Sequence, residues 1–232
     1  TRLVGDSVAG YQAATLGKPG VLVICGTGTS VIVGDLESKF THLGGWGPLL
    51  EDKGSAYWIA VKAIRAAIDD FENTGEETAI TSTLCELYEI KNIQGIVPII
   101  YHPEFTRDKF AILAARIDKA LDGKDKVFQN ICEEAGKEVA KLTIKTVEKA
   151  KLDISPLPIF FSGGVLTYNH YAQKSFEDTL RDRFHIMLSQ PKLPTVLGSV
   201  IIALKDSGVT IDSDLVAQLN KSYFEVDELS KT

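Results

Sequence analysis

Short apolar runs near the start of the chain predict an antiparallel meander of strands. Residues 21–25 and 30–33 form two such runs, joined by Gly26-Thr27-Gly28-Thr29, and a third run follows at residues 40–43. Apolar runs of this length that are bounded by glycine are typical of buried strands connected by tight turns. We therefore expect three antiparallel strands in this part of the chain.

Beyond residue 54 the apolar positions recur every three or four residues, which is the period of an amphipathic helix. One long helix is expected to end near Phe71, and another begins at Gly123 and extends to about residue 150. The stretch between them, residues 76–122, is irregular and predicts a helical insert. The remaining expected elements are a strand at 159–161, a helix at 168–183, a strand at 185–188 and a helix at 194–206. This alternation predicts an α/β fold with a mixed sheet and helices on both faces.

Composition and charge narrow the classes of protein that remain. The 232 residues are 44% apolar and 24% charged, which is ordinary for a globular protein. The longest apolar runs are far shorter than the ~20 residues of a spanning helix, so we expect no membrane partner. A net charge of −6 gives no broad basic surface for nucleic acid. The three cysteines are widely spaced and predict neither disulfides nor a metal site, which favours the cytoplasm.

Glycine clusters follow three of the predicted strands. They are Gly26 and Gly28, residues 44–47, and the pair Gly163 and Gly164. Glycine turns after strands let backbone N–H groups converge on an anion such as phosphate. The patterns of the P-loop and of the dinucleotide fold are both absent, so a phosphate site would belong to another architecture. For the first cluster alone, a plain hairpin turn is the favoured interpretation, with a phosphate-binding turn as the alternative.

Two aspartates and one tryptophan are candidate functional residues, each with a structural alternative. Asp6 precedes a predicted helix, where it could be an N-cap or a general base beside a reacting hydroxyl. Asp52 also lies just before a helix and could be a cap. Trp46 is flanked by glycines and could pack in the core or present its ring to a sugar.

The motifs in combination resemble a known family. Gly26-Thr27-Gly28-Thr29, Gly44-Gly45-Trp46-Gly47 and the segment from Asp52 to Ile59 occur in the order and spacing of N-acetylglucosamine kinases and archaeal hexokinases. These enzymes form part of the BadF/BadG/BcrA/BcrD group within the sugar kinase, Hsp70 and actin superfamily. Further matches are Asp122 to Asp125, Phe161 to Val165, Pro194, Gly198-Ser199 and Ala203-Leu204. The resemblance implies an RNase H-like, actin-like ATPase domain and phosphorylation of a sugar hydroxyl with ATP and Mg²⁺.

Roles for individual residues follow from the resemblance. Asp6 would be the catalytic base that deprotonates the sugar hydroxyl, and Asp52 would accept a hydrogen bond from the sugar. The residues that would bind ATP or its phosphates are Thr27, Gly28, Gly163, Gly164 and Gly198. The residues that would border the sugar are Thr29, Ser30, Gly45, Trp46 and Gly47. Phosphoryl transfer depends mainly on positioning and on donors to phosphate oxygens, so glycine turns with one carboxylate suit this chemistry.

The chain also departs from the family. Glu51 and Lys53 flank Asp52 where the family has glycine and glutamate, and the family's opening phosphate hairpin is missing. We therefore expect a truncated or processed chain that is inactive alone. Residues 1–19 would end an N-terminal lobe and residues 20–232 would form the C-terminal lobe, which the resemblance implies pairs as a homodimer. The alternatives are an ATP-dependent activator, which would need cluster-binding cysteines, and a non-catalytic sugar sensor.

Overall fold

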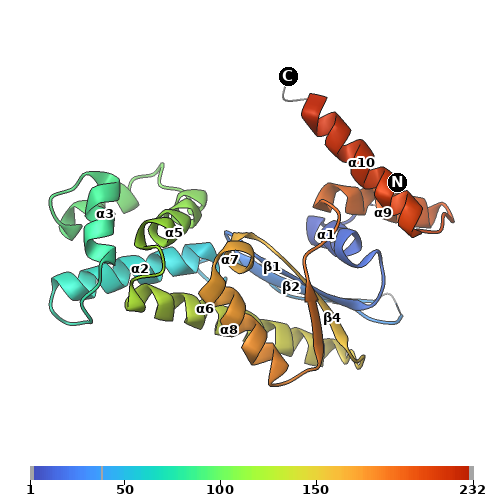
Figure 1. Cartoon of the computed structure of the whole chain (residues 1–232), viewed down its shortest axis with the longest axis horizontal. Coiled ribbons are helices and arrows are strands. Elements are labelled where there is room, and N and C mark those ends of the chain that lie inside the picture. Colours follow the sequence, from blue (N-terminus) through green and yellow to red (C-terminus); the bar gives the residue numbers. More distant parts are fainter. Residues whose placement is uncertain (1–2, 38, 230–232) are drawn as a thin grey trace.

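A five-stranded mixed sheet organises the molecule (Figure 1). The computed structural model describes residues 3–37 and 39–229. Strands β1 (Gly20–Cys25), β2 (Thr29–Gly34) and β3 (Phe40–Gly44) form the antiparallel meander expected from the sequence. Strands β4 (Leu157–Ser162) and β5 (Ile186–Ser189) extend the sheet in parallel with β1. The strand order β3-β2-β1-β4-β5 confirms the mixed α/β architecture.

One face of the sheet carries the main core. Val21, Val23, Val31 and Val33 alternate along β1 and β2 and pack against α6 (Lys126–Ala150), which in turn packs on α8 (His170–Arg181). Both helices begin at a side-chain cap: Asp125 accepts from the Phe128 N–H, and Asn169 accepts from the Ala172 N–H. Asn169 is extended and stands between α7 (Gly164–Tyr168) and α8. The helix expected at 168–183 is α8, and the short helix α7 precedes it.

The opposite face is covered by the two ends of the chain. Helix α1 (Asp6–Thr15) packs on Leu22 and Ile32, and α9 (Thr195–Asp206) packs against α1. A further helix, α10 (Ser213–Leu229), follows α9 and was not expected from the sequence. Among the helices of residues 3–37 and 39–229, none has both the length and the apolar character needed to cross a membrane.

The predicted insert is a helical unit beside one end of the sheet (Figure 1). Helix α2 (Ala56–Phe71) leads to α3 (Ile80–Tyr88), the 3₁₀ helix η1 (Ile93–Ile96), α4 (Val97–Ile100) and α5 (Arg107–Leu121). Helix α5 packs back on α2, where the rings of Tyr57 and Phe110 have centroids 4.6 Å apart. The insert is therefore fixed to α2, which in turn packs on α6.

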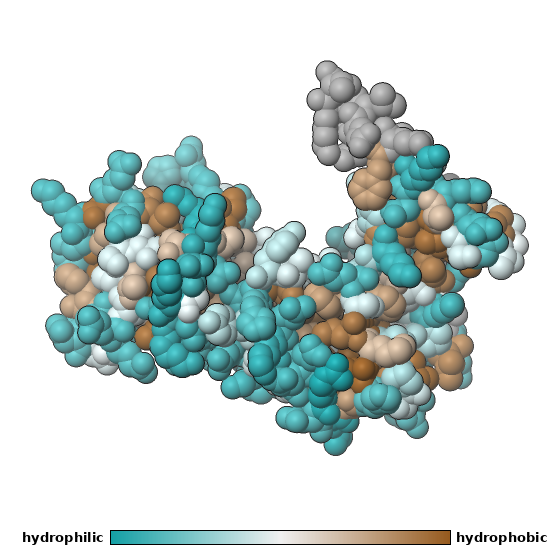
Figure 2. Space-filling model, viewed as in Figure 1, coloured by the Kyte–Doolittle hydropathy of each residue, from teal (hydrophilic) through white to brown (hydrophobic). Residues whose placement is uncertain are grey.

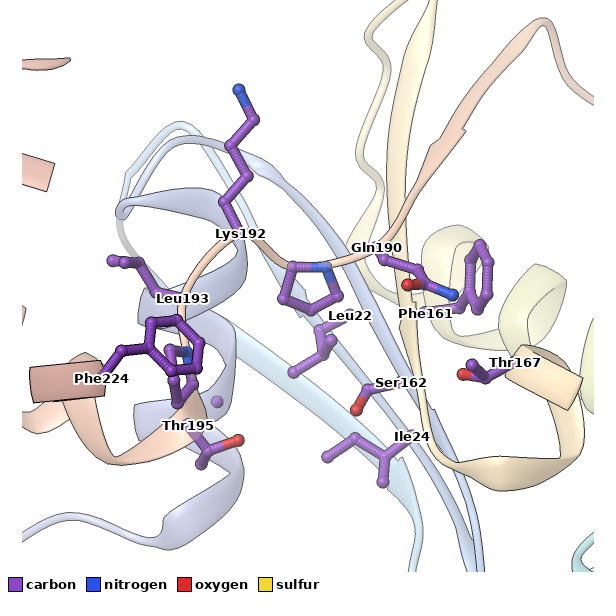
Figure 3. Close-up of a pocket in the computed structure, with 13 residues that line it drawn as sticks. Leu22, Ile24, Phe161, Ser162, Thr167, Gln190, Lys192, Leu193, Thr195 and Phe224 are labelled. Atoms are coloured by element: carbon purple, nitrogen blue, oxygen red, sulfur yellow. The ribbon is translucent and has the colours of Figure 1, made fainter. Parts of the chain in front are cut away.

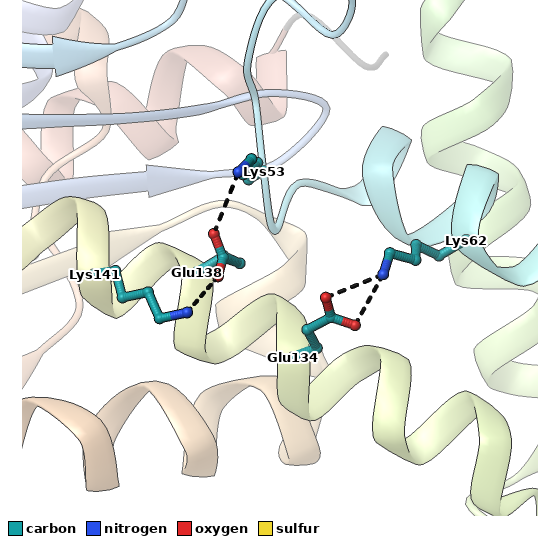
Figure 4. Close-up of polar contacts among 5 residues, drawn as sticks. All are labelled: Lys53, Lys62, Glu134, Glu138 and Lys141. Atoms are coloured by element: carbon teal, nitrogen blue, oxygen red, sulfur yellow. Dashed lines mark hydrogen bonds and ion pairs between the residues drawn. The ribbon is translucent and has the colours of Figure 1, made fainter.

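Ion pairs tie the start of this unit to α6 (Figure 4). Lys62 of α2 contacts Glu134 at 3.0 Å, and Lys53 lies 4.0 Å from Glu138. Glu138 also pairs with Lys141 at 2.6 Å on the same helix. Exposed pairs of this kind contribute only about 0–1 kcal/mol to stability, so their main effect is to orient the segment before α2.

Candidate functional site

The two glycine turns meet at the carboxyl ends of β1 and β4. These strands are parallel, so both turns lie at the same edge of the sheet, where open α/β sheets bind their ligands. Gly163 has φ +99°, and a Cβ there would lie 2.3 Å from the Cys25 carbonyl oxygen. The contact shows that the turns at Gly26 and Gly163 lie directly beside each other. It also explains why position 163 tolerates no side chain.

Backbone hydrogen bonds join the three sequence motifs into one unit. The Gly45 N–H donates to the Thr29 carbonyl at 2.8 Å, and the Ala56 N–H donates to the Gly26 carbonyl at 2.8 Å. The Thr29 N–H donates to Asp52 Oδ1 at 3.1 Å. The loop after β3 and the segment before α2 are thereby both anchored on the turn between β1 and β2.

Asp52 is buried beneath this turn. Its side chain is 1% exposed, its φ is +56°, and Arg107 Nη2 donates to its Oδ2 at 2.9 Å. The N-cap of α2 is Ser55, whose hydroxyl oxygen accepts from the Trp58 N–H at 3.2 Å. The alternative that Asp52 is the helix cap is therefore wrong.

A cavity of about 650 Å³ opens beside the turns. Its walls include Gly26, Thr27 and Gly164 from the turns and several small side chains from α5. The α5 contribution consists of Ala111, Ala114 and Ala115, with Ile112, Asp108, Asp118 and Lys119 around them. Small apolar walls next to two glycine turns suit a flat aromatic group that carries phosphates.

Asp118 is the half-buried carboxylate of this cavity. Burial raises its pKa, and a hydrogen bond from Asn169 Nδ2 to Oδ1 at 2.9 Å opposes that rise. The same amide nitrogen donates to Cys132 Sγ at 3.3 Å. Asp118 thus has an acceptor oxygen fixed within the cavity, which is suited to a ligand hydroxyl.

A second cavity, of about 380 Å³, lies on the sheet face that α1 covers. In Figure 3, Ile24 and Ser162 lie on the strand side of this cavity, and Leu193 and Thr195 lie on the other. Figure 2 shows the surface hollowed between the helical insert and the α9–α10 end. This cavity shares no lining residue with the 650 Å³ cavity.

Asp6 is exposed at the first position of α1. Its Oδ1 accepts only from the adjacent Ser7 N–H, at 2.7 Å, among the contacts seen in the described chain. The N-cap residue is Gly5, so the alternative that Asp6 is the N-cap is wrong. The carboxylate therefore has acceptor positions open to solvent.

The direction of α1 carries Asp6 toward the glycine turns. Tyr11, farther along the helix, donates to the Lys18 carbonyl at 2.6 Å, just before β1 begins. Val8 belongs to the small core cluster that contains Ile24, near the end of β1. The amino end of α1 thus points to the same sheet edge as the turn.

The residues predicted to border the sugar divide into exposed and buried groups. Trp46 is 72% exposed between glycines at φ +76° and +91°, so it is not a core residue. A Cβ at Gly45 would lie 3.6 Å from Ser30 Cβ, which places Ser30 beside this loop. Thr29 is 2% exposed, with its hydroxyl 3.9 Å from Cys25 Sγ. The Thr29 side chain is therefore packed in the core, and its backbone holds Asp52 and the Gly45 loop in place.

Gly198 is placed apart from the other predicted ATP-binding residues. It lies in α9, where a Cβ would come within 1.7 Å of the Ala9 carbonyl oxygen of α1. It is not among the residues that line the 650 Å³ cavity. The close approach of two helices accounts for glycine at this position.

Arg107 and Asp118 are site residues that the sequence did not reveal. Both belong to the insert, which was described only as an irregular helical segment. Arg107, Ala111, Ala114 and Asp118 follow one another at intervals of four, three and four residues along α5. This is the period of one helix face, but it forms no recognised motif. Within residues 3–37 and 39–229, no three His, Cys, Asp or Glu side chains are grouped to hold a metal ion.

The chain belongs to the BadF/BadG/BcrA/BcrD ATPase family, whose model matches residues 4–203. The fold is accordingly of the RNase H-like type found in actin-like ATPases. The chain is 27% identical over 202 residues to the N-acetylmuramic acid/N-acetylglucosamine kinase of Clostridium acetobutylicum, and the match covers 87% of this chain and 66% of that protein. It is 28% identical over 162 residues to the N-acetyl-D-glucosamine kinase of Dictyostelium discoideum, covering 68% and 51%.

A crystal structure shares the fold. This Chromobacterium violaceum protein, proposed to be an N-acetylglucosamine kinase, superposes with a TM-score of 0.68 at 19% identity, over 86% of this chain and 65% of that one. The chain thus spans between one half and two thirds of the length of the relatives that it matches.

Proposed function

We propose that this chain is the nucleotide-binding part of an ATP-dependent kinase that phosphorylates a hydroxyl of N-acetylglucosamine or a related hexosamine. The observation that carries the proposal is the meeting of the Gly26–Thr29 and Gly163–Gly164 turns beside a 650 Å³ cavity. The cavity fits a nucleoside, and the turns offer backbone N–H groups to its phosphates. Two relatives named as amino-sugar kinases support the choice of acceptor.

In this proposal the sugar lies on the other side of the turns from the nucleoside. Asp6 accepts the proton of the attacking hydroxyl, since its carboxylate oxygens are accessible. Ser30, Gly45, Trp46 and Gly47 border the sugar. Asp52 orients this loop through Thr29, and a sugar hydroxyl would reach its carboxylate only if Arg107 moved aside.

The cation in this proposal is Mg²⁺, which would enter with the triphosphate. In the described part of the chain, neither Asp6 nor Asp52 belongs to a group of three side chains that could hold a metal ion. Mg²⁺ would neutralise the phosphate charge during transfer. Removing it with a chelator should abolish activity, and added Mg²⁺ should restore it.

The test is ADP release by the longest natural form of the protein, with N-acetylglucosamine, N-acetylmuramic acid, glucose and no sugar compared side by side. Sugar-dependent release is expected, together with a higher melting temperature in ATP–Mg²⁺, because a ligand that binds only the folded state stabilises it. Release that is the same without sugar would contradict the proposed acceptor. No release and no thermal shift would contradict the function.

We also propose that the protein works in the cytoplasm as a homodimer. All three cysteines are free thiols, which suits a reducing compartment. The dimer is supported by the family resemblance alone. Light scattering that gives a single 25.3 kDa species at micromolar concentration would contradict it.

A further inference from the structure

Arg107 brings a cation from the helical insert onto the turn between β1 and β2. It is the first residue of α5, and its Nη2 lies 2.9 Å from Asp52 Oδ2. A Cβ at Gly28 would lie only 2.1 Å from the same Nη2 and 2.8 Å from Asp52 Oδ2. The guanidinium therefore rests directly against the Gly28 backbone, in space that is open only because position 28 has no side chain.

The two members of this ion pair lie in different surroundings. Asp52 is 1% exposed, whereas the Arg107 side chain is 46% exposed. Both oxygens of Asp52 are engaged, one by the Thr29 N–H and one by Arg107. A guanidinium has five N–H donors, and in the described chain only Asp52 receives one from Arg107. Arg107 is thus held through Nη2 alone, and its other N–H donors stay accessible.

This cation stands where the nucleoside cavity meets the turn. Asp108, which follows Arg107 directly, and Ala111, one turn further along α5, line the cavity together with Gly26 and Thr27. The Asp108 carboxylate accepts from the Thr106 hydroxyl, and the acidic group that Arg107 contacts is Asp52. A phosphate that extends from the cavity along the turn would therefore meet a fixed guanidinium.

We propose that Arg107 binds the terminal phosphate of the nucleoside triphosphate at the Gly26–Thr29 turn, an inference that rests on the proposed kinase function. During transfer the sugar oxygen forms a bond to the terminal phosphorus, the bond from that phosphorus to the bridging oxygen of the diphosphate breaks, and Asp6 takes the hydroxyl proton. Negative charge on the transferred group is stabilised by a planar guanidinium, which suits phosphate oxygens. Asp52 is the positioning residue that holds Arg107 there.

The experiment compares the phosphate contribution to binding in matched variants. Adenosine, ADP and the non-hydrolysable β,γ-imido analogue of ATP are titrated by calorimetry, with Mg²⁺, into wild type, Arg107→Gln, Arg107→Lys and Arg116→Gln. Arg116 is an exposed cation on the same helix that does not line the cavity, so it controls for net charge. Arg107→Gln is expected to weaken the ATP analogue ~10–100-fold, as for a lost hydrogen bond to a charged group, and to leave adenosine within twofold.

The possible results distinguish failure of the Arg107 proposal from failure of the proposed kinase function. If wild type binds neither adenosine nor the ATP analogue, the kinase proposal fails and Arg107 fails with it. If wild type binds both and Arg107→Gln weakens both equally, Arg107 is only structural and the inference is overturned. Should Arg107→Gln fail to fold, Arg107→Lys keeps the charge beside Asp52 but lacks the planar fork. It should then weaken the ATP analogue several-fold without changing adenosine, and an unchanged affinity would overturn the inference.

Discussion

The amino end of α1 and the segment before α2 each bring one carboxylate to the same edge of the sheet, but in opposite environments. Asp6 is exposed and accepts a hydrogen bond from its own neighbour Ser7. Asp52 is 1% exposed, and its two oxygens are taken by Thr29 and Arg107. The family resemblance implies that both act on the sugar, whereas in the structure one carboxylate is exposed and the other is buried in an ion pair.

The difference shows which carboxylate can exchange a proton. A general base needs a free lone pair within reach of the substrate, and Asp6 has acceptor positions open. Asp52 is 1% exposed and paired with Arg107, so a new donor would reach it only by disturbing this buried ion pair, which costs free energy. We therefore propose that Asp6 takes part in the chemistry and that Asp52 holds the turn and Arg107 in place.

The largest expected effect is on turnover in Asp6→Asn. An amide cannot take the hydroxyl proton, so kcat should fall by ~10²–10⁴-fold in the longest natural form of the protein. The KM for sugar should change much less, because the amide oxygen still accepts a hydrogen bond. Steady-state kinetics at saturating ATP–Mg²⁺ measures both quantities.

The stability of Asp6→Asn serves as its control. Since Asp6 is exposed, the free energy of unfolding should stay within about 0.5 kcal/mol of wild type. A near-wild-type kcat in a folded Asp6→Asn variant would remove the catalytic assignment.

The next largest effect is on folding in Asp52→Ala. This change leaves the Thr29 N–H without its buried acceptor and Arg107 without its ion-pair partner, and should lower the free energy of unfolding by about 1–3 kcal/mol. Urea denaturation monitored by circular dichroism measures the loss. Asp6→Ala is the matched variant, and an equal loss in both would break the contrast between the two carboxylates.

Gly198→Ala tests the support of α1 separately from the nucleoside cavity. The added methyl group would press on the Ala9 carbonyl, so α1 and α9 must separate at a cost of about 1–3 kcal/mol. Adenosine affinity should stay within twofold, because Gly198 does not line the cavity. A selective loss of adenosine binding at unchanged stability would instead favour the nucleotide role that the resemblance implies.

The sequence predicted the sheet better than it predicted the site. Strands β1, β2 and β4 are short apolar runs between glycines and prolines, so their positions were readable from local pattern alone. The meeting of the Gly26 and Gly163 turns follows from the parallel pairing of β1 and β4, because parallel strands end at one edge.

Contacts between distant segments were not readable in this way. Arg107 reaches Asp52 across 55 positions, and that pairing depends on how the insert folds back through α2 and α5. Helix α10 was missed because its apolar positions are sparse, with Val216, Leu219 and Tyr223 packing near Leu193 and Ile201. Single-residue roles such as that of Gly198 depend on helix packing, which a glycine in the sequence does not specify.

The smallest expected effect concerns the two tryptophans, which repeat the contrast between an exposed and a packed group. Trp46 is 72% exposed in the glycine loop beside Ser30, whereas Trp58 lies on α2 with Lys62 Nζ 4.8 Å from its ring centroid.

A sugar bound at this loop should stack on the Trp46 ring and quench its fluorescence. Trp46→Phe should lose the quenching and change the free energy of unfolding by less than about 0.5 kcal/mol, since little of the ring is buried. Trp58→Phe should keep the quenching. Quenching that survives in Trp46→Phe and disappears in Trp58→Phe would identify Trp58 as the ring that senses the sugar and would contradict the role proposed for Trp46.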